Sequence, residues 1–505
     1  MFSELGNYSS PQYQVILIAI GAYALYARYG YGISKYPGPL LASITNFWRL
    51  GYTVRGRHSM PMVDLHKKYG NVVRYGPNML SFSDPRAIQD IYMGTDQFPK
   101  SDLYAISDII LNGEKHETLF STRNPGRHGK MRRAYGPAFS MTAVAHLEIY
   151  VDETINFFMK TTTDRYANKI GPEGSLDIGQ WMQYFAFDVL GQLVYGERHG
   201  FIERNDDVDG IIGVVNVGNI YNYNIGHVSW MDSFLYKNPM LNWLAEKGYI
   251  DLAFAVIPFA RKHITKRENR PKTGVDESTG SLLDRMLALQ ENNPEMLSNI
   301  EIVKLCAILS FAGSDTTAIT ISALFYYLVK NPGVYSKLLK EIDGALPAGS
   351  ARLPFVTAQT LPYFEICLKE TFRVHPATAF NFERVVPAGG RKVGKDFIPG
   401  GTIVGMNPWT VHRNQDIFGK DADIWRPERW LDTERAAEMN KYMFHFGAGS
   451  HMCIGRNISM LEIYKIVPVF LRTFEISLEK PYAQWKLYNT MFAKPTDCNM
   501  RLRSR

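Results

Sequence analysis

The sequence predicts a mainly α-helical fold with a minor β region, in one large domain after a short N-terminal segment. Helical hydrophobic patterns run from Gly126 to Leu346. Val72–Ser83 has the β-branched and aromatic character of a hairpin, and short strand and turn patterns return over Val385–Val404. No internal repeat or second set of motifs divides the chain. Residues 31–505 are therefore expected to form a single domain.

The amino-acid composition argues against several classes of protein function. Hydrophobic residues make up 46% of the chain and charged residues 21%, which predicts a large packed core. The net charge is only +7, with no long run of Lys and Arg, so no nucleic-acid partner is expected. The four cysteines are widely spaced and form no CxxC pair, which disfavours a zinc cage or a disulfide framework. A reducing compartment fits this usage.

The N-terminus contains an uncharged apolar run, Val15–Ala27, flanked by tyrosines. No basic residue precedes it, which disfavours a cleaved signal peptide, whereas a buried core helix remains an alternative. We predict that residues 1–30 form a single-pass signal-anchor. Because Arg28 and Lys35 follow the run, the positive-inside rule leaves the rest of the chain in the cytosol. The sequon at Asn7 would then lie on the lumenal side.

A second long apolar segment spans Ile300–Val329 and has two possible interpretations. Its length would allow it to cross a membrane, but Asp315 lies near its middle, where an acid is costly in a bilayer. A helix that is apolar on all sides can instead be the buried axis of a large domain. We expect the buried helix.

The most specific motif is FGAGSHMCIG, residues 446–455, in which Cys453 lies in a glycine-rich turn before a helical pattern. Gly447, Gly449 and Gly455 permit a tight backbone beside a large flat group. Backbone N–H groups at the helix start would stabilise a thiolate, and an axial thiolate on a haem iron favours O–O cleavage. The alternative is a buried structural cysteine.

Glu370 and Arg373 lie three residues apart on one predicted helix face, among apolar neighbours. An exposed ion pair of this kind usually contributes little to stability. A buried pair needs a further partner, and Arg429 in the following PERW sequence is the candidate.

The centre of the long helix reads AGSDTT, residues 312–317. Gly313 removes a side chain from one face, beside Ala312, and Thr316 can bond the carbonyl of Ala312. The resulting groove could hold dioxygen, with Asp315 and Thr316 as a proton route. A polar cluster that caps a kink is the alternative.

A basic turn containing His128 and Arg132 precedes another apolar helix. Solvated surface charge is the usual explanation. The two propionates of a haem would need such cationic or donor partners, and Arg suits carboxylates well.

Taken together and in this order, these motifs resemble the cytochrome P-450 family over essentially the whole chain. FGAGSHMCIG matches FxxGxRxCxG except that His451 replaces Arg, and HxxxR places His128 where the family has Trp. The resemblance implies these roles: Cys453 as axial iron ligand; Phe446, Gly447, Gly449, His451, Gly455, His128, Arg132, Arg384, Ala312 and Gly313 as haem-binding residues; Glu370, Arg373 and Arg429 as a structural triad; Thr316 and Asp315 as the catalytic pair.

The resemblance also implies a cofactor and partners. These are haem b, dioxygen as co-substrate, and electrons from NADPH through a separate NADPH–cytochrome reductase, with cytochrome b5 as a second candidate donor. Lys130, Arg133 and Arg456 are candidates for the reductase-docking face, and ordinary solvated charge explains them equally well. An endoplasmic reticulum location with the catalytic domain in the cytosol follows from the anchor.

The implied reaction is oxidation of a lipophilic small molecule. YGPNMLSFSDP, FPKSDLY and MNPWTVHRN resemble the fungal microsomal branch, and FSTRN…HGKMRRAYGPAFS resembles pisatin-demethylase-like enzymes of secondary metabolism. A haem-thiolate isomerase or dehydratase and a non-catalytic haem sensor remain alternatives, which the Asp315–Thr316 pair disfavours. By analogy the pocket contains these apolar and aromatic residues: Tyr104, Ile106, Tyr221, Phe311, Phe380, Phe382 and Phe492.

Overall fold

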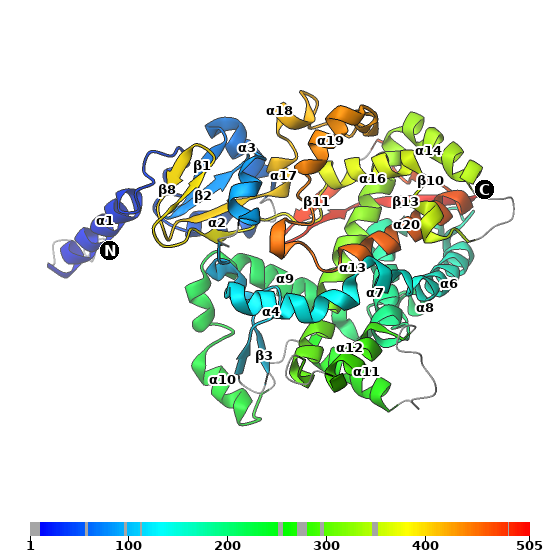
Figure 1. Cartoon of the computed structure of the whole chain (residues 1–505), viewed down its shortest axis with the longest axis horizontal. Helices are drawn as coiled ribbons and strands as arrows, with labels where there is room; N and C mark the ends of the chain where they lie inside the picture. The colour runs from blue at the N-terminus through cyan, green and yellow to red at the C-terminus, as the bar shows by residue number, and fades with distance from the viewer. Residues whose placement is uncertain are drawn as a thin grey trace, which may run out of the picture.

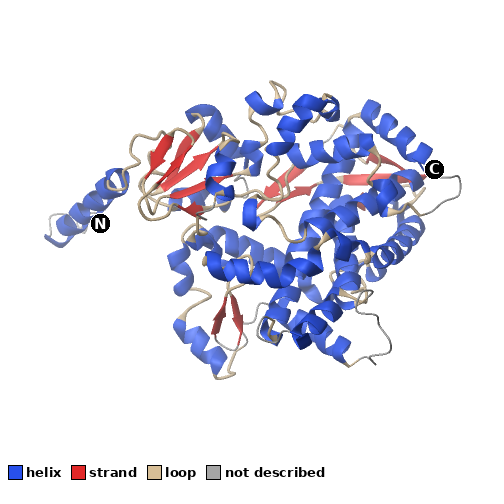
Figure 2. Ribbon diagram, in the orientation of Figure 1, coloured by secondary structure: helices blue, strands red, loops and turns tan. Residues whose placement is uncertain are grey.

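The computed structural model describes residues 11–55, 59–94, 98–111, 114–250, 256–269, 280–292, 297–345, 352–482 and 484–505. Helices form most of this part of the chain, as predicted (Figures 1 and 2). The longer helices are α1 (Pro11–Tyr29), α3 (Ser59–Tyr69), α4 (Pro125–Tyr135), α6 (Glu148–Tyr166), α7 (Ile178–Tyr195), α9 (Ile211–Gly226), α11 (Val256–Glu268), α12 (Leu282–Asn292), α13 (Asn299–Lys330), α14 (Pro332–Ala345), α16 (Pro362–Val374) and α20 (Arg456–Thr473).

Short helices connect these elements. The α-helical ones are α2 (Phe47–Thr53), α5 (Met141–Ala145), α8 (Phe201–Arg204), α10 (Pro239–Glu246), α15 (Phe355–Ala358), α17 (Pro408–Val411), α18 (Gln415–Phe418) and α19 (Thr433–Lys441). The site also involves the π-helix η1 (Gln89–Met93) and the 3-10 helices η2 (Asp102–Ser107), η3 (Gly136–Phe139), η7 (Pro427–Leu431) and η8 (Gly449–His451).

The β region is small and divided among several places, with the largest sheet next to the N-terminal helix (Figures 1 and 2). Its largest sheet has the order β1-β2-β9-β6, with β2 and β9 parallel and the other pairs antiparallel. The predicted hairpin over residues 72–83 is confirmed as β1 and β2. The strands of this sheet are β1 (Val72–Gly76), β2 (Met79–Phe82), β6 (Arg384–Val385) and β9 (Ile403–Met406).

The remaining strands form one three-stranded sheet and three hairpins. The order in the sheet is β10-β13-β5, and the hairpins are β3-β4, β7-β8 and β11-β12. Their bounds are β3 (Ile109–Leu111), β4 (Glu114–His116), β5 (Leu176–Asp177), β7 (Arg391–Val393), β8 (Asp396–Ile398), β10 (Phe474–Leu478), β11 (Lys486–Asn489), β12 (Ala493–Thr496) and β13 (Asn499–Ser504).

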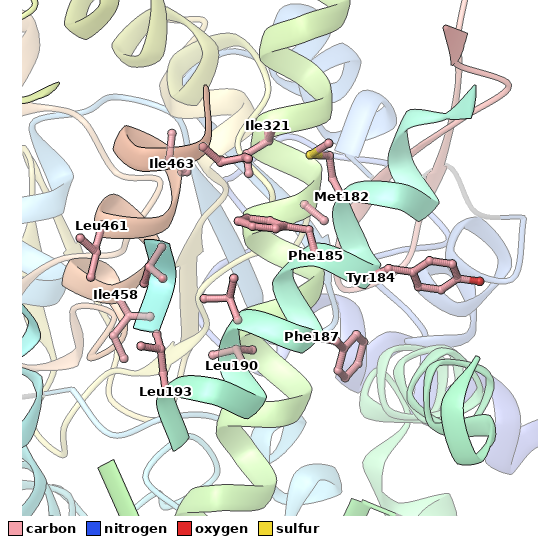
Figure 3. Packing of buried hydrophobic residues seen from close by; sticks show 14 of the residues in the cluster. Met182, Tyr184, Phe185, Phe187, Leu190, Leu193, Ile321, Ile458, Leu461 and Ile463 are labelled. Carbon is pink, nitrogen blue, oxygen red and sulfur yellow. The ribbon is translucent and has the colours of Figure 1, made fainter. Parts of the chain in front are cut away.

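The helical core is built around α13, which packs most extensively against α7. Figure 3 shows apolar side chains of α7, α13 and α20 meeting, among them Phe185, Ile321 and Leu461. All three side chains have no exposed surface. Close packing of this kind fixes helix positions to fractions of an ångström. The core therefore holds α13 and the start of α20, which carry the site, in a rigid relation.

By length and composition, α13 is the one described helix apolar enough to cross a membrane, and 71% of its most apolar window is buried inside the protein. This supports the interpretation of residues 300–329 as a buried axis. Helix α1 does not meet the same criterion. It projects from the body next to the β region (Figure 1), with the apolar side chains of Val15, Ile18 and Leu25 exposed.

The end of α1 is nevertheless attached to the sheet. The buried guanidinium of Arg74 in β1 donates to the carbonyls of Ala27 and Arg28, over 2.6 and 2.7 Å. These are the unpaired carbonyls of the last helical turn, where a cation also interacts favourably with the helix dipole. Burial lowers the pKa of Arg74 to about 10. This contact fixes where α1 leaves the body.

Candidate active site

The Cys453 loop is a tight turn held by its own backbone. The Cys453 N–H donates to the carbonyl of Phe446 over 2.8 Å, and η8 precedes the cysteine. Gly447 and Gly449 have φ values of +73° and +63°, which favour glycine. A Cβ on Gly449 would lie 2.0 Å from the carbonyl oxygen of Tyr92 in η1. Glycine is thus required at Gly449 by both conformation and space.

Protein surrounds the Cys453 thiol, but its side chain is accessible because it opens into an internal cavity. Burial raises its pKa, while the backbone N–H groups of Gly455 and Arg456 and the guanidinium of Arg132 oppose this rise. The start of α20 thus offers the stabilisation expected for a thiolate. Coordination to a metal is what would deprotonate the sulfur fully.

The cavity has a volume of about 570 Å³ and gathers most of the predicted site. Its wall contains nine predicted residues: Cys453, Phe446, Gly447, His451, His128, Arg132, Arg384, Ala312 and Thr316. Three predicted cofactor contacts and one catalytic residue lie outside the wall: Gly449, Gly455, Gly313 and Asp315.

Gly313 has a different role from the predicted one. A Cβ there would lie 2.9 Å from Cδ1 of Leu190, so the missing side chain allows α7 to approach α13. The groove expected at Gly313 is therefore filled by Leu190. The predicted bond of Thr316 is present, with its hydroxyl donating to the Ala312 carbonyl over 2.9 Å. Thr316 itself lines the cavity.

Asp315 is buried and lies outside the cavity wall. Its carboxylate forms an ion pair with Lys494 of β12 at 2.9 Å and accepts hydrogen bonds from Gln183 of α7 and Asn219 of α9. Lys494 also donates to Asn216 of α9, over 2.6 Å. The acid therefore lies next to Thr316 in sequence but is held by three other elements of the fold.

One edge of the cavity is basic. Besides His128, Arg132, Arg384 and His451, the wall contains Lys100, whose ammonium donates to the carbonyls of Leu119 and Phe120. The rings of His128 and His451 are in contact, with centroids 3.9 Å apart and planes tilted by 34°, and Nδ1 of both is buried without a partner among the described residues. Burial first, and then neighbouring cations, lower the pKa of His128 to about 3.

This edge fits an anionic group. Burial and Arg384 together hold the pKa of Lys100 well below its ordinary value, because the cluster concentrates positive charge away from water. Two carboxylates would supply both the missing hydrogen-bond acceptors and the missing counter-charge. These donors would suit the propionates of a haem, and Cys453 would be the residue that binds its iron.

The predicted Glu370–Arg373–Arg429 triad is present and fully buried. Glu370 accepts from Nε and Nη2 of Arg373 and from Nε of Arg429, each over 2.8 Å, and from the indole of Trp430 over 2.9 Å. Burial alone would raise the pKa of Glu370, but these bonds and charges outweigh it and lower the pKa. The triad joins α16 to η7.

His412 connects the triad to the cysteine loop. Its Nε2 accepts from the backbone N–H of Phe444 over 2.8 Å, so its Nδ1 carries the proton that bonds the Arg373 carbonyl at 3.1 Å. Burial and nearby cationic groups keep its pKa well below the ordinary value, so the ring is neutral. A continuous hydrogen-bonded path thus runs from Glu370 to the segment that presents Cys453.

A family model identifies the family of this chain. The cytochrome P-450 family model matches residues 37–500. This chain belongs to the cytochrome P-450 family. The predicted family and its oxidoreductase class are confirmed.

Several relatives of this cytochrome P-450 are fungal proteins. It is 36% identical to cytochrome P-450 monooxygenase cicH of Emericella nidulans over 484 residues, 94% of each chain. A cytochrome P-450 monooxygenase of Aspergillus terreus is 34% identical over 476 residues, covering 92% of this chain and 93% of the relative. A crystal structure of a cytochrome P-450 matches the fold with a TM-score of 0.73 at 18% identity, covering 88% of this chain and 94% of the other.

The rest of the cavity wall of this cytochrome P-450 is mainly apolar. Six of the seven predicted lining residues are in it: Tyr104, Ile106, Tyr221, Phe380, Phe382 and Phe492. The side chain of the seventh, Phe311, lies outside the described part of the structure. Sequence reasoning missed Lys100 at the basic edge, although it lies in the FPKSDLY stretch that carried part of the resemblance.

Proposed function

We propose that this protein is a haem b-dependent monooxygenase that inserts one oxygen atom from dioxygen into a lipophilic small molecule in fungal secondary metabolism. The observation that carries this proposal is the arrangement of one cavity. Cys453 opens into it beside a basic edge, Thr316 of α13 lines it, and much of the remaining wall is apolar. When bound, the haem supplies dioxygen binding and O–O cleavage, which an axial thiolate promotes.

The residues of this chain would bind the haem, orient the substrate and move protons. Arg132, Arg384, Lys100 and the adjacent rings of His128 and His451 would hold the propionates, and the apolar wall excludes water and orients the substrate. The Thr316 hydroxyl is placed to pass a proton into the cavity. Asp315 can pass a proton to it only after its carboxylate leaves Lys494 and takes up a proton from solvent.

Oxygen incorporation separates this function from the isomerase, dehydratase and sensor alternatives. Full-length protein in membranes is mixed with NADPH–cytochrome reductase, NADPH, ¹⁸O-labelled dioxygen and a panel of lipophilic terpenoids and polyketides. A monooxygenase gives a product carrying one labelled oxygen and consumes NADPH in step with it. A product without label supports an isomerase or dehydratase, and the absence of any product across the panel supports a sensor.

The proposal includes a membrane location. Helix α1 exposes a continuous set of apolar side chains. Arg28 lies in its last turn and Lys35 follows it, which suits a signal-anchor of the endoplasmic reticulum with a cytosolic catalytic domain. Asn7 lies outside the described residues. Full-length protein should resist alkaline carbonate extraction from microsomes, and protein without residues 1–30 should be released. Release of both forms would contradict the anchor.

The electron donor is a separate reductase, with cytochrome b5 as a second candidate. Lys130 and Arg133 of α4 and Arg456 of α20 are exposed, and both helices contact the cysteine loop, where Arg132 and Arg456 bond Met452. An acidic partner would bind this face. Replacing the three cations by Gln should raise the KM for reductase and weaken its salt dependence, without changing substrate binding.

A further inference from the structure

A second pocket shares no lining residue with the cavity at Cys453. It has a volume of about 650 Å³ and lies where the end of α6, the start of α7, the strand β5 and the turn after α8 meet. Its wall is mostly polar and contains the carboxylates of Asp177, Asp206 and Glu479. The same wall contains no lysine, arginine or histidine among the described residues.

Two of these three carboxylates have no cationic partner in the described part of the chain. Glu479 pairs with Arg501 at 2.6 Å. Asp177 caps α7 and accepts a backbone N–H over 3.1 Å, and Asp206 accepts the N–H of the next residue over 2.8 Å, but neither forms an ion pair. The pocket therefore keeps negative charge in a protein whose net charge is +7.

The hydroxyl of Tyr184 also lacks a partner in this pocket. Its side chain is only 3% exposed, and Figure 3 shows it pointing away from Phe185 and the other labelled core residues of α7. Tyr184 lines the pocket, and its hydroxyl forms no hydrogen bond with a described residue. Burial first, and then Asp206 and other nearby carboxylates, raise the pKa of Tyr184 to about 12. The buried ring thus holds a neutral hydroxyl in a fixed position beside the acids.

The charge and the shape of the wall decide which ligand fits. Uncompensated carboxylates favour a cation. A metal ion does not fit, because no three Cys, His, Asp or Glu side chains in the described ranges are close enough to hold one. A quaternary ammonium would need the face of an aromatic ring, but the ring of Tyr184 is buried and presents its hydroxyl instead. A cation that carries N–H donors suits these acceptors.

We propose that this pocket binds a small alkyl diamine, whose two ammonium groups are matched by Asp177 and Asp206 and hydrogen-bonded by the Tyr184 hydroxyl. The size of the pocket is typical of sites for small organic ligands and exceeds what a single ion needs. This site is separate from the cavity at Cys453, and its occupation does not depend on the chemistry proposed there.

The test is calorimetric titration of the full-length holoenzyme in neutral detergent with 1,4-diaminobutane at low ionic strength. The iron is saturated with imidazole beforehand, so that the amine cannot ligate it. We expect saturable binding to one site, about tenfold tighter than that of 1,4-butanediol, which has the same length and no charge. Added salt should weaken the binding of the diamine. Tetramethylammonium and calcium chloride are titrated in the same way.

Three variants locate the binding. Tyr184→Phe keeps the buried ring and removes the hydroxyl, and Asp206→Asn removes a charge from an exposed turn, where the fold tolerates the change. Each should weaken the binding of the diamine about fivefold or more. Glu203→Gln is the matched control, because Glu203 is an exposed carboxylate three positions before Asp206 and lies outside the pocket wall. It should leave the affinity unchanged.

Several results would overturn the proposal. These are the absence of saturable binding at millimolar diamine, equal affinities for the diamine and the diol, and tighter binding of calcium or tetramethylammonium than of the diamine. An undiminished affinity in Asp206→Asn, or an equal loss in Glu203→Gln, would show only general attraction to surface charge and would overturn it as well.

Discussion

Replacing Glu370 by Gln tests the structural logic of the site. The substitution keeps the shape of the side chain but leaves Arg373 and Arg429 buried without their shared carboxylate. Breaking a buried ion pair from one side costs about 3–5 kcal/mol. The loss also weakens the bonds to Trp430 and to the backbone of Arg426. The path through His412 should then hold the cysteine loop less firmly.

The assay is urea unfolding of the holoenzyme, followed by tryptophan fluorescence and by the thiolate–iron–carbon monoxide band. Glu370→Gln should lower the free energy of unfolding by about 3–5 kcal/mol and lose the thiolate band at lower urea than the global transition. Glu365→Gln is the control, because Glu365 forms a half-exposed pair with Lys369 on the same helix. Such pairs contribute about 0.3–0.5 kcal/mol. Equal effects of both variants would refute the reasoning.

Three further predictions concern separate parts of the molecule. Asp315→Asn should lower turnover about 10²-fold or more with unchanged substrate-binding spectra, because Asp315 lies outside the cavity wall; weaker substrate binding would contradict this. Lys494→Met, which strips the cation from Asp315, should also impair turnover. Burial lowers the pKa of His66 to about 4, so between pH 6.5 and 4 the unfolded chain gains a proton that the folded protein does not. The free energy of unfolding should fall by about 1.4 kcal/mol per pH unit from this residue, and His66→Gln should remove that slope in urea titrations. Gly449→Ala should abolish haem incorporation, because its Cβ would meet a carbonyl oxygen at 2.0 Å, whereas Gly447→Ala, whose nearest neighbour is 3.5 Å away, should retain haem with reduced stability. Equal haem content in the two glycine variants would contradict the steric argument.

The fold class and the ordered motifs were predictable because each depends on the types and spacing of residues that are close in the sequence. The hairpin over residues 72–83 follows from its β-branched and aromatic residues and its turn, and the buried helix from apolar residues interrupted by Asp315. The triad was predictable from Glu370 and Arg373 sharing a helix face, with Arg429 as the missing partner. These features need only neighbours in sequence and one long-range contact.

The surroundings of Asp315 and Gly313 were not predictable in the same way. Lys494 reaches Asp315 from a hairpin that lies 179 positions later in the sequence. Leu190 fills the space left by Gly313 because α7 crosses α13 at that point. Both contacts depend on how elements that are distant in the sequence pack together. The local hydrophobic pattern does not indicate such packing.

The most direct test of the proposed function is to identify the protein ligand of the haem iron. Full-length protein is reduced with dithionite and treated with carbon monoxide, and the difference spectrum is recorded beside that of Cys453→Ala. If Cys453 is the iron ligand, the unmodified protein shows a red-shifted Soret band typical of a thiolate–iron–carbon monoxide complex. The variant loses this band. A band typical of histidine-ligated haem in freshly folded protein, or a thiolate band that survives in Cys453→Ala, would contradict it.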